Sequence, residues 1–317
     1  MIKVKLLKQF DADCSIGYCE LLKRFSEIGM VARELGRAFS IMVNMFMDKE
    51  CHRLLGIAGA AVASGLRPLI TKLIRFGFVN TIVTTGANIT HDIIEAIGGK
   101  HFVLEREEID DVKLAKMGIY RIYNIGVTKE SYIMLEKFVD ETFGSISGTF
   151  SSSDIVKMLA SRINDENSFV RASYELGVEV FSPALADSII GSQIRFRTGG
   201  KVKLDTFSDI GKLVDRVWTS KRTGAIFLGG GTPKHFTMMA VNMADRPLSY
   251  AVQITTDREE HGGLSGARLE EAKSWGKVKV EGMIANVCLD MSIALPLLLL
   301  AFEEWMRQQR PENTLKS

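Results

Sequence analysis

Short apolar runs recur along the chain, and each is followed by small or polar residues and then by a helix-like pattern. The runs cover residues 53–58, 81–85, 225–228, 250–254 and 285–289. Helical patterns follow at 66–78, 91–99 and 292–305, and Pro233 is placed to open a further helix. Continuous apolar strands that alternate with helices indicate a mainly parallel sheet with helices on both faces. The sequence therefore predicts an α/β fold.

A serine-rich loop at residues 144–153 is the candidate domain boundary. One of its serines is expected to cap a helix that begins near Asp154, whose charge suits a helix N-terminus. Strands of the same kind occur on both sides of this loop, so we expect one large α/β domain over residues 51–306. Residues 1–50 are expected to form an N-terminal helical segment, and the polar residues 307–317 a frayed C-terminal tail.

Composition excludes several classes of protein. The 317 residues are 46% hydrophobic, and 40 basic against 38 acidic residues give a net charge of +2, which excludes intrinsic disorder. Proteins that bind nucleic acid through phosphates normally carry a larger basic excess or a basic stripe, so no nucleic-acid partner is expected. The most apolar stretch, residues 293–302, contains Pro296 and is too short to cross a bilayer, so we expect no membrane association.

The N-terminal apolar run is too short and too interrupted by lysine for a signal peptide. The four cysteines are too few and too scattered for a disulfide framework, and free thiols in a reducing compartment are the simplest interpretation. We therefore expect a soluble cytoplasmic protein. The G-x-G-x-x-G, P-loop and H-E-x-x-H motifs are all absent, and the five histidines are dispersed, so no metal site is expected.

Candidate binding residues follow the predicted strands, where ligands collect in parallel α/β folds. The triplet 229–231 is all glycine, which suits either close approach of a phosphate or a tight strand-to-helix turn, and both interpretations stay open. Lys234 and His235 add a cation and a titratable ring nearby. Asp187 and Asp290 suit ribose hydroxyls or helix N-caps equally well.

The densest polar segment covers residues 255–277. This segment carries three acids and an imidazole: Asp257, Glu259, Glu260 and His261. Such a group suits either the binding of a cationic substrate such as an amine or a solvated loop. Lys277 follows Trp275 and Gly276, and a lysine kept from water by an indole has a lowered pKa and can act as a Schiff-base nucleophile. Most lysines are merely solvated, so this sequence context alone does not assign the role.

Five segments together resemble the deoxyhypusine synthase family. They read TIVTTGANITHD, FSPALAD, FLGGGTPKH, LSGARLEEAKSWGK and LDMSIALPLL, and the similarity runs from about Leu54 to Ala301. The segment with E-A-x-S-W-G-K is the most specific of the five. The resemblance implies a Rossmann-like homotetrameric enzyme that binds NAD, with active sites between paired subunits. It also implies transfer of the aminobutyl group of spermidine, through an enzyme imine, to a lysine of the translation factor 5A precursor.

The resemblance also implies roles for individual residues. Lys277 matches the imine-forming lysine and His235 the histidine of the polyamine site. Further polyamine-site matches are His91, Gly262, Glu271 and Trp275. The matches to cofactor-binding positions are Thr85, Gly86, Asp187, Gly230, Thr256, Asp257 and Asp290.

Several acids of eukaryotic members are absent at the matching positions. Thr90 and His91 stand where those members carry glutamates, and Ser192 stands in place of an aspartate. We expect Asp92, Glu259 and Glu260 to supply the missing charge. The E-E-H-G-G-L-S-G form resembles prokaryotic members, some of which pass the aminobutyl group to putrescine and make homospermidine. Homospermidine synthesis is therefore the first alternative, and a non-catalytic NAD-binding regulator is the second. The acidic run 105–111 suits a solvated face or a site for a basic protein partner.

Overall fold

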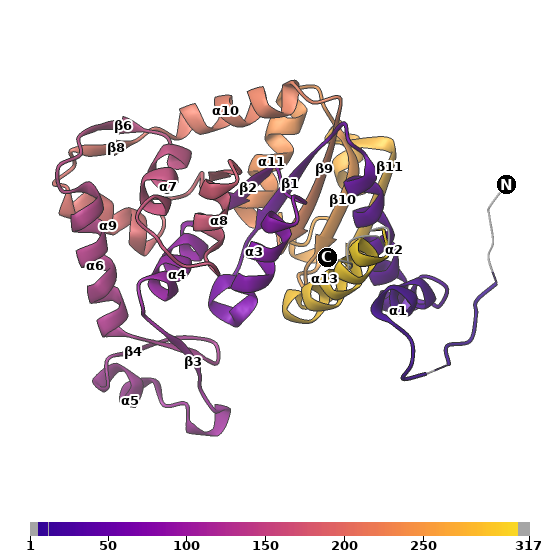
Figure 1. Cartoon of the computed structure of the whole chain (residues 1–317), viewed down its shortest axis with the longest axis horizontal. Helices are drawn as coiled ribbons and strands as arrows, with labels where there is room; N and C mark the ends of the chain where they lie inside the picture. Colours follow the sequence, from indigo (N-terminus) through magenta and orange to yellow (C-terminus); the bar gives the residue numbers. More distant parts are fainter. Residues whose placement is uncertain (1–5, 12, 310–317) are drawn as a thin grey trace, which may run out of the picture.

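The computed structural model describes residues 6–11 and 13–309, so residues 310–317 of the predicted tail lie outside the described part. A six-stranded sheet forms its centre, in the order β11-β10-β9-β1-β2-β7 (Figure 1). All five neighbouring pairs are parallel. This confirms the predicted α/β fold with a mainly parallel sheet. The strands are β1 (Cys51–Ile57), β2 (Thr81–Thr84), β7 (Glu179–Phe181), β9 (Arg222–Leu228), β10 (Leu248–Ile254) and β11 (Val278–Val287).

Helices cover both faces of this sheet because successive side chains of each strand point to opposite sides and both sets are apolar. Leu55 and Ile57 of β1 belong to the core on one face, and Leu54 to the core on the other. The first core includes side chains of α1 (Tyr18–Phe25), α2 (Met30–Met47), α3 (Arg67–Arg75), α4 (Gly86–Ala96), α6 (Lys129–Phe143), α7 (Ser152–Ala160), α8 (Phe169–Glu175), α9 (Ile189–Arg197) and α13 (Met291–Gln308). The second includes side chains of α10 (Thr206–Trp218) and α11 (Gly231–Met243), with α12 (Glu271–Ser274) packed against it.

Side-chain caps set the starts of the helices near the sheet edge. Ser151 and Asp154 form a capping box at the start of α7, which confirms the predicted serine cap. Helix α4 begins at Gly86 rather than near His91, because the Thr85 hydroxyl accepts a hydrogen bond from the Asn88 amide and caps it. A short π-helix, η1 (Val62–Leu66), precedes α3 and was not predicted.

Two small sheets were also not predicted. Antiparallel β3 (His101–Val103), β5 (Ile125–Thr128) and β4 (Ile119–Ile122) form one, and with α5 (Asp111–Lys116) they project from the main body (Figure 1). Parallel β6 (Gly148–Phe150) and β8 (Val202–Leu204) form the other. These strands of three or four residues lack the continuous apolar run that marks a strand buried on both faces, so the sequence did not reveal them. The short 3-10 segments are η2 (Arg106–Glu108) and η3 (Glu259–His261).

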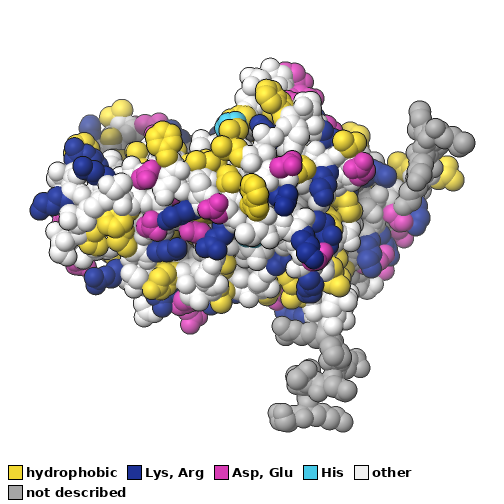
Figure 2. Space-filling model, turned by 90° about the horizontal axis from the view of Figure 1, so that it is seen from above, with side chains coloured by type: hydrophobic (Ala, Val, Ile, Leu, Met, Phe, Trp, Pro, Cys, Tyr) yellow, Lys and Arg dark blue, Asp and Glu magenta, His cyan; other side chains and the backbone are white. Residues whose placement is uncertain are grey.

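The acidic run 105–111 has structural partners of its own. Asp110 caps α5 by accepting from the amides of Val112 and Lys113. Asp111 makes two hydrogen bonds to Arg121, at 2.7 and 2.9 Å. On the face in Figure 2, basic side chains lie among acidic and apolar ones and form no continuous stripe. In the described ranges, no helix has the length and apolar character that crossing a membrane requires.

Candidate active site

The carboxyl edge of the large sheet collects the predicted cofactor residues. Each follows a strand, and the strand order places them side by side along this edge. From one side of the sheet to the other they are Asp290 after β11, Thr256 and Asp257 after β10, Gly230 after β9, Thr85 and Gly86 after β2, and Asp187 after β7. Residues far apart in the sequence therefore form one row, where parallel α/β folds bind their ligands.

The chain reverses its direction across the sheet between β1 and β9. From β1 it continues to β2 and β7 on one side, and later strands β9, β10 and β11 fill the other side. A crevice forms at such a switch point, outside the carboxyl ends of the two strands. Gly59 after β1 and Gly229 after β9 both have positive φ, 65° and 79°, so the backbone turns sharply there. The sequence places Gly59 at the end of a predicted strand but does not single it out as a binding residue.

The structure gives a packing reason for the second glycine of the triplet. A Cβ on Gly230 would lie 2.4 Å from Cα of Ser265, so no larger residue fits. The Ser265 hydroxyl also accepts a hydrogen bond from the Gly231 amide at 3.1 Å. The first amide of α11 thus has a partner within the chain. Of the two interpretations left open, the tight turn is realised, and Gly230 as a cofactor contact stays a prediction.

The two aspartates differ in their local roles. Asp290 caps α13 by accepting from the Ser292 amide at 2.8 Å and from its hydroxyl at 2.5 Å. These bonds hold the pKa of Asp290 below its ordinary value, so the exposed carboxylate is ionised at neutral pH. Asp187 does not cap α9, because Ser188 does so through the Gly191 amide. The N-cap alternative for Asp187 is therefore wrong, and its side chain is exposed at the sheet edge.

A hollow of about 290 Å³, the edge pocket, lies at the carboxyl ends of β10 and β11. Asp257, Glu259 and Glu260 line it, and all three come from the segment interpreted as a solvated loop or an amine site. A hydrogen bond from His261 Nδ1, 2.7 Å from Oδ1, lowers the pKa of Asp257. The remaining lining residues are Gln253, Thr255, Arg258, Gly266, Arg268, Asn286, Val287 and Cys288.

A second hollow of about 360 Å³, the lysine pocket, lies between α11 and α12. It brings together four residues predicted from the sequence: His235, Glu271, Trp275 and Lys277. Its other lining residues are Lys234, Met238, Met239, Asn242, Leu264, Ala267, Arg268 and Ala272. Arg268 lines both pockets, so they adjoin and the segment 264–268 lies between them.

Lys277 and His235 both line the lysine pocket, close enough for their charges to interact. The Lys277 ammonium lies 5.1 Å from the centre of the Trp275 ring, within the range of a cation–π interaction. Partial burial, with the nearby Lys277 charge, lowers the pKa of His235. His235 is therefore neutral at pH 7 and able to accept a proton. Because Trp275 is 64% exposed, the indole encloses the amine only partly within one chain.

Lys234 is the buried cation between the two pockets. It is 5% exposed, and its ammonium donates to Oε1 of Gln253 at 2.8 Å, to the Leu264 carbonyl at 3.1 Å and to the Ala267 carbonyl. Gln253 also donates to the Ser265 carbonyl at 2.7 Å. These bonds attach segment 264–268 to the sheet and so set the wall that separates the two pockets. The sequence signal for this role was a glutamine inside the apolar run 250–254.

We expect Lys234 to make stability depend on pH. Burial lowers its pKa from 10.5 to about 8, so the folded chain binds fewer protons than the unfolded chain between these values. The free energy of unfolding should therefore rise by about 3 kcal/mol as the pH rises from 8 to 10.5. Urea unfolding of the wild type and of Lys234→Met at both pH values measures this. The variant should lack the rise, and an equal rise in both proteins would contradict the assignment.

Two predicted polyamine residues lie outside the lysine pocket. His91 is in α4, buried beside His101, and Gly262 follows η3 in a left-handed turn with φ 68°. Neither lines the lysine pocket in this chain. That His91 and Gly262 bind the substrate stays a prediction, because within one chain neither residue lies in the pocket that contains Lys277.

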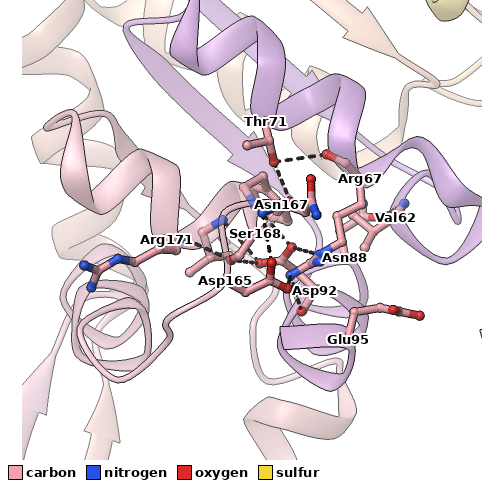
Figure 3. Close-up of polar contacts among 12 residues, drawn as sticks. Val62, Arg67, Thr71, Asn88, Asp92, Glu95, Asp165, Asn167, Ser168 and Arg171 are labelled. Atoms are coloured by element: carbon pink, nitrogen blue, oxygen red, sulfur yellow. Dashed lines mark hydrogen bonds and ion pairs between the residues drawn. The ribbon is translucent and has the colours of Figure 1, made fainter. Parts of the chain in front are cut away.

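Asp92, expected to supply charge to a polyamine, is instead part of a buried ion-pair network (Figure 3). It is 0% exposed, and Nε of Arg67 lies 2.6 Å from Oδ1, while Arg67 also pairs with Asp165 at 2.8 Å. Asp92 further accepts from the Ser168 hydroxyl at 2.5 Å and from the amides of Phe169 and Val170 at 3.2 and 3.3 Å. Its carboxylate thus caps α8 and neutralises Arg67. The expectation that Asp92 contacts the substrate is wrong, since no part of it is accessible.

Comparison with known proteins identifies what this chain resembles. The family model described as deoxyhypusine synthase matches residues 20–302. A relative in Archaeoglobus fulgidus, named probable deoxyhypusine synthase 2, is 38% identical over 291 residues, covering 89% of this chain and 97% of the relative. A relative in Methanopyrus kandleri, named probable deoxyhypusine synthase, is 38% identical over 283 residues, covering 89% and 91%.

A solved structure has the same fold. The crystal structure of a protein from Entamoeba histolytica assigned as a deoxyhypusine synthase matches with a TM-score of 0.63. The match covers 93% of this chain and 96% of that one, at 22% sequence identity. The predicted resemblance is confirmed.

Proposed function

The chain belongs to the deoxyhypusine synthase family, and from this we propose that it transfers the aminobutyl group of spermidine to a lysine of the translation factor 5A precursor. Family membership implies an enzyme of the aminobutyltransferase class. The observation that carries the proposal is the convergence of His235, Glu271, Trp275 and Lys277 in one pocket. NAD as cofactor, a homotetramer and a cytoplasmic location belong to the same proposal.

The row of residues at the carboxyl edge fits a dinucleotide. Asp257 and Asp290 have pKa values held below the ordinary value, so each presents an ionised carboxylate able to accept from ribose hydroxyls. The N-terminus of α4, which begins at Gly86, suits a pyrophosphate because the first amides of a helix carry partial positive charge. Bound there, NAD would supply hydride acceptance from the carbon beside the secondary amine of spermidine and hydride return at the end of the reaction.

Lys277 acts as the nucleophile in this proposal. Its neutral amine adds to the carbon–nitrogen double bond of oxidised spermidine, the bond to 1,3-diaminopropane breaks, and the aminobutyl group remains on Lys277 as an imine. His235, neutral at pH 7, accepts the proton that the attacking amine loses and donates it to the departing amine. Glu271, across the same pocket, offers a carboxylate to the remaining ammonium group of the substrate. The acceptor amine then displaces Lys277, which restores the free lysine.

A second subunit over the lysine pocket would complete the site. Leu264 and Trp275 line the pocket and are 47% and 64% exposed, so apolar side chains face outward at its rim. Covering them would remove apolar surface from water and enclose the Lys277 amine. The exposed apolar rim supports paired subunits that meet over the lysine pocket.

Product analysis decides the acceptor. Labelled spermidine and NAD are incubated with putrescine and the translation factor 5A precursor together, and label is followed into each. We expect label on the precursor protein and release of 1,3-diaminopropane. Label mainly in homospermidine would favour homospermidine synthesis, the first alternative. The motive for this alternative is that Asp92 is buried against Arg67 and cannot serve as a substrate-binding acid. Absence of both products would favour a non-catalytic NAD-binding regulator.

A further inference from the structure

Three ionisable side chains form a hydrogen-bonded chain at the far end of α4. His91 Nδ1 lies 2.8 Å from His101 Nε2, and His101 Nδ1 lies 2.6 Å from Oε1 of Glu95. The same oxygen accepts the His101 amide at 3.0 Å, so the carboxylate is fixed at the start of β3. Both imidazoles are 8% exposed. Figure 3 shows Glu95 directed away from the Asp92 network, so the two groups of contacts are separate.

The carboxylate fixes which nitrogens carry protons. Glu95 in its ionised form only accepts, so His101 Nδ1 must donate to it. A neutral His101 then has an unprotonated Nε2, which accepts from Nδ1 of His91. His91 is left with an unprotonated Nε2, a proton acceptor at the inner end of the chain. Lys100 Nζ lies 3.8 Å from Oε2, the other oxygen of Glu95.

The arrangement also decides where a positive charge can reside. Burial, with the neighbouring His101, lowers the pKa of His91 to about 4, so His91 does not hold a proton at neutral pH. If Nε2 of His91 receives a proton, its Nδ1 proton can pass to His101. The charge then lies beside the Glu95 carboxylate, where it is paired.

The surroundings of the chain leave this path open. Glu95 and His101 line a hollow of about 380 Å³ beside η1, through which His101 can exchange protons with water. Arg67 also lines this hollow, but its charge is paired with Asp92 and Asp165. Besides His101, the ionisable residues that line the hollow are Glu95 and the paired Arg67, and Lys100 lies 3.8 Å from Glu95.

We propose that Glu95, His101 and His91 form a proton relay in which Nε2 of His91 takes a proton from an ammonium group of the polyamine substrate. This proposal rests on the proposed function and on His91 meeting substrate in the assembled enzyme. The amine must lose its proton before the adjacent carbon can give up a hydride. One N–H bond of the substrate breaks, the proton binds His91, and the proton of His91 Nδ1 moves to His101. No oxidant or reductant is involved in this step.

The test measures release of 1,3-diaminopropane from spermidine and NAD in single turnovers between pH 6.5 and 10. His101→Phe interrupts the relay without touching substrate, and Glu95→Gln removes the charge with no change in size. Both variants should lose about 10²-fold at pH 7, the usual contribution of a general base. The loss should shrink about tenfold per pH unit as the free amine deprotonates by itself.

His52→Gln is the matched control. His52 is also buried with a pKa of about 4, but its Nε2 meets only the Thr81 hydroxyl, at 2.9 Å, and no carboxylate. Its pH profile should follow that of the wild type. A loss in Glu95→Gln that is equal at every pH, or no loss, would overturn the relay alone. An inactive wild type would instead refute the proposed function and the relay with it.

Discussion

Lys277→Ala should abolish aminobutyl transfer. The variant loses the amine that carries the group between substrate and acceptor. Lys234, the other lysine that lines the lysine pocket, cannot replace it, because its ammonium is bound to Gln253 and to two carbonyls. Loss of a covalent nucleophile typically costs several orders of magnitude, so we expect a fall of about 10³-fold or more in labelled product.

The matched control is Lys279→Ala. Lys279 is an exposed lysine in the next strand, β11, two positions further on, and it does not line the pocket. Its removal should leave transfer near the wild-type rate. If Lys277→Ala retained transfer at the rate of this control, Lys277 would not be the nucleophile, and the assignment of roles in the lysine pocket would be wrong.

Asp92→Ala should give the largest loss of stability. The variant leaves the Arg67 guanidinium without its closest partner and the first amides of α8 without their acceptor. Breaking a buried ion pair by removing one member costs about 3–5 kcal/mol. The free energy of unfolding, measured by urea denaturation at pH 7, should fall by that amount.

An exposed ion pair provides the comparison. Asp111 pairs with Arg121 with its side chain 65% exposed, and Asp111→Ala should shift the urea midpoint little. The milder variant Asp92→Asn distinguishes a structural role of Asp92 from a role in substrate binding. If the folded variant showed a raised KM for spermidine with unchanged stability, the buried-network assignment would be wrong and Asp92 would contact substrate after all.

The large sheet was predictable because both of its faces are buried. Burial on both sides makes a strand such as 225–228 wholly apolar, and its carboxyl end is marked by the glycines that follow. The same pattern predicts that Asp257 and Asp290 lie at one edge, since each follows a parallel strand. The lysine pocket could be predicted only from the family resemblance. A helix, a strand and a long loop separate His235 from Lys277 in the sequence, so no local pattern places the two side chains together.

The roles of single polar residues were harder to predict. Asp92 depends on Arg67, Asp165 and Ser168, which come from other segments of the chain, and sequence spacing does not reveal such contacts. The Gly230 packing depends likewise on Ser265. Both cases depend on contacts between residues that are far apart in the sequence, whereas a strand is predicted from residues that are neighbours in it.

Trapping the covalent intermediate tests the central claim most directly. The wild-type protein is incubated with spermidine and NAD, reduced with borohydride, digested and examined by mass spectrometry. We predict an aminobutyl group on the peptide that contains Lys277, dependent on NAD. An unmodified Lys277 in enzyme that turns over spermidine, or a modification on another lysine, would contradict the account.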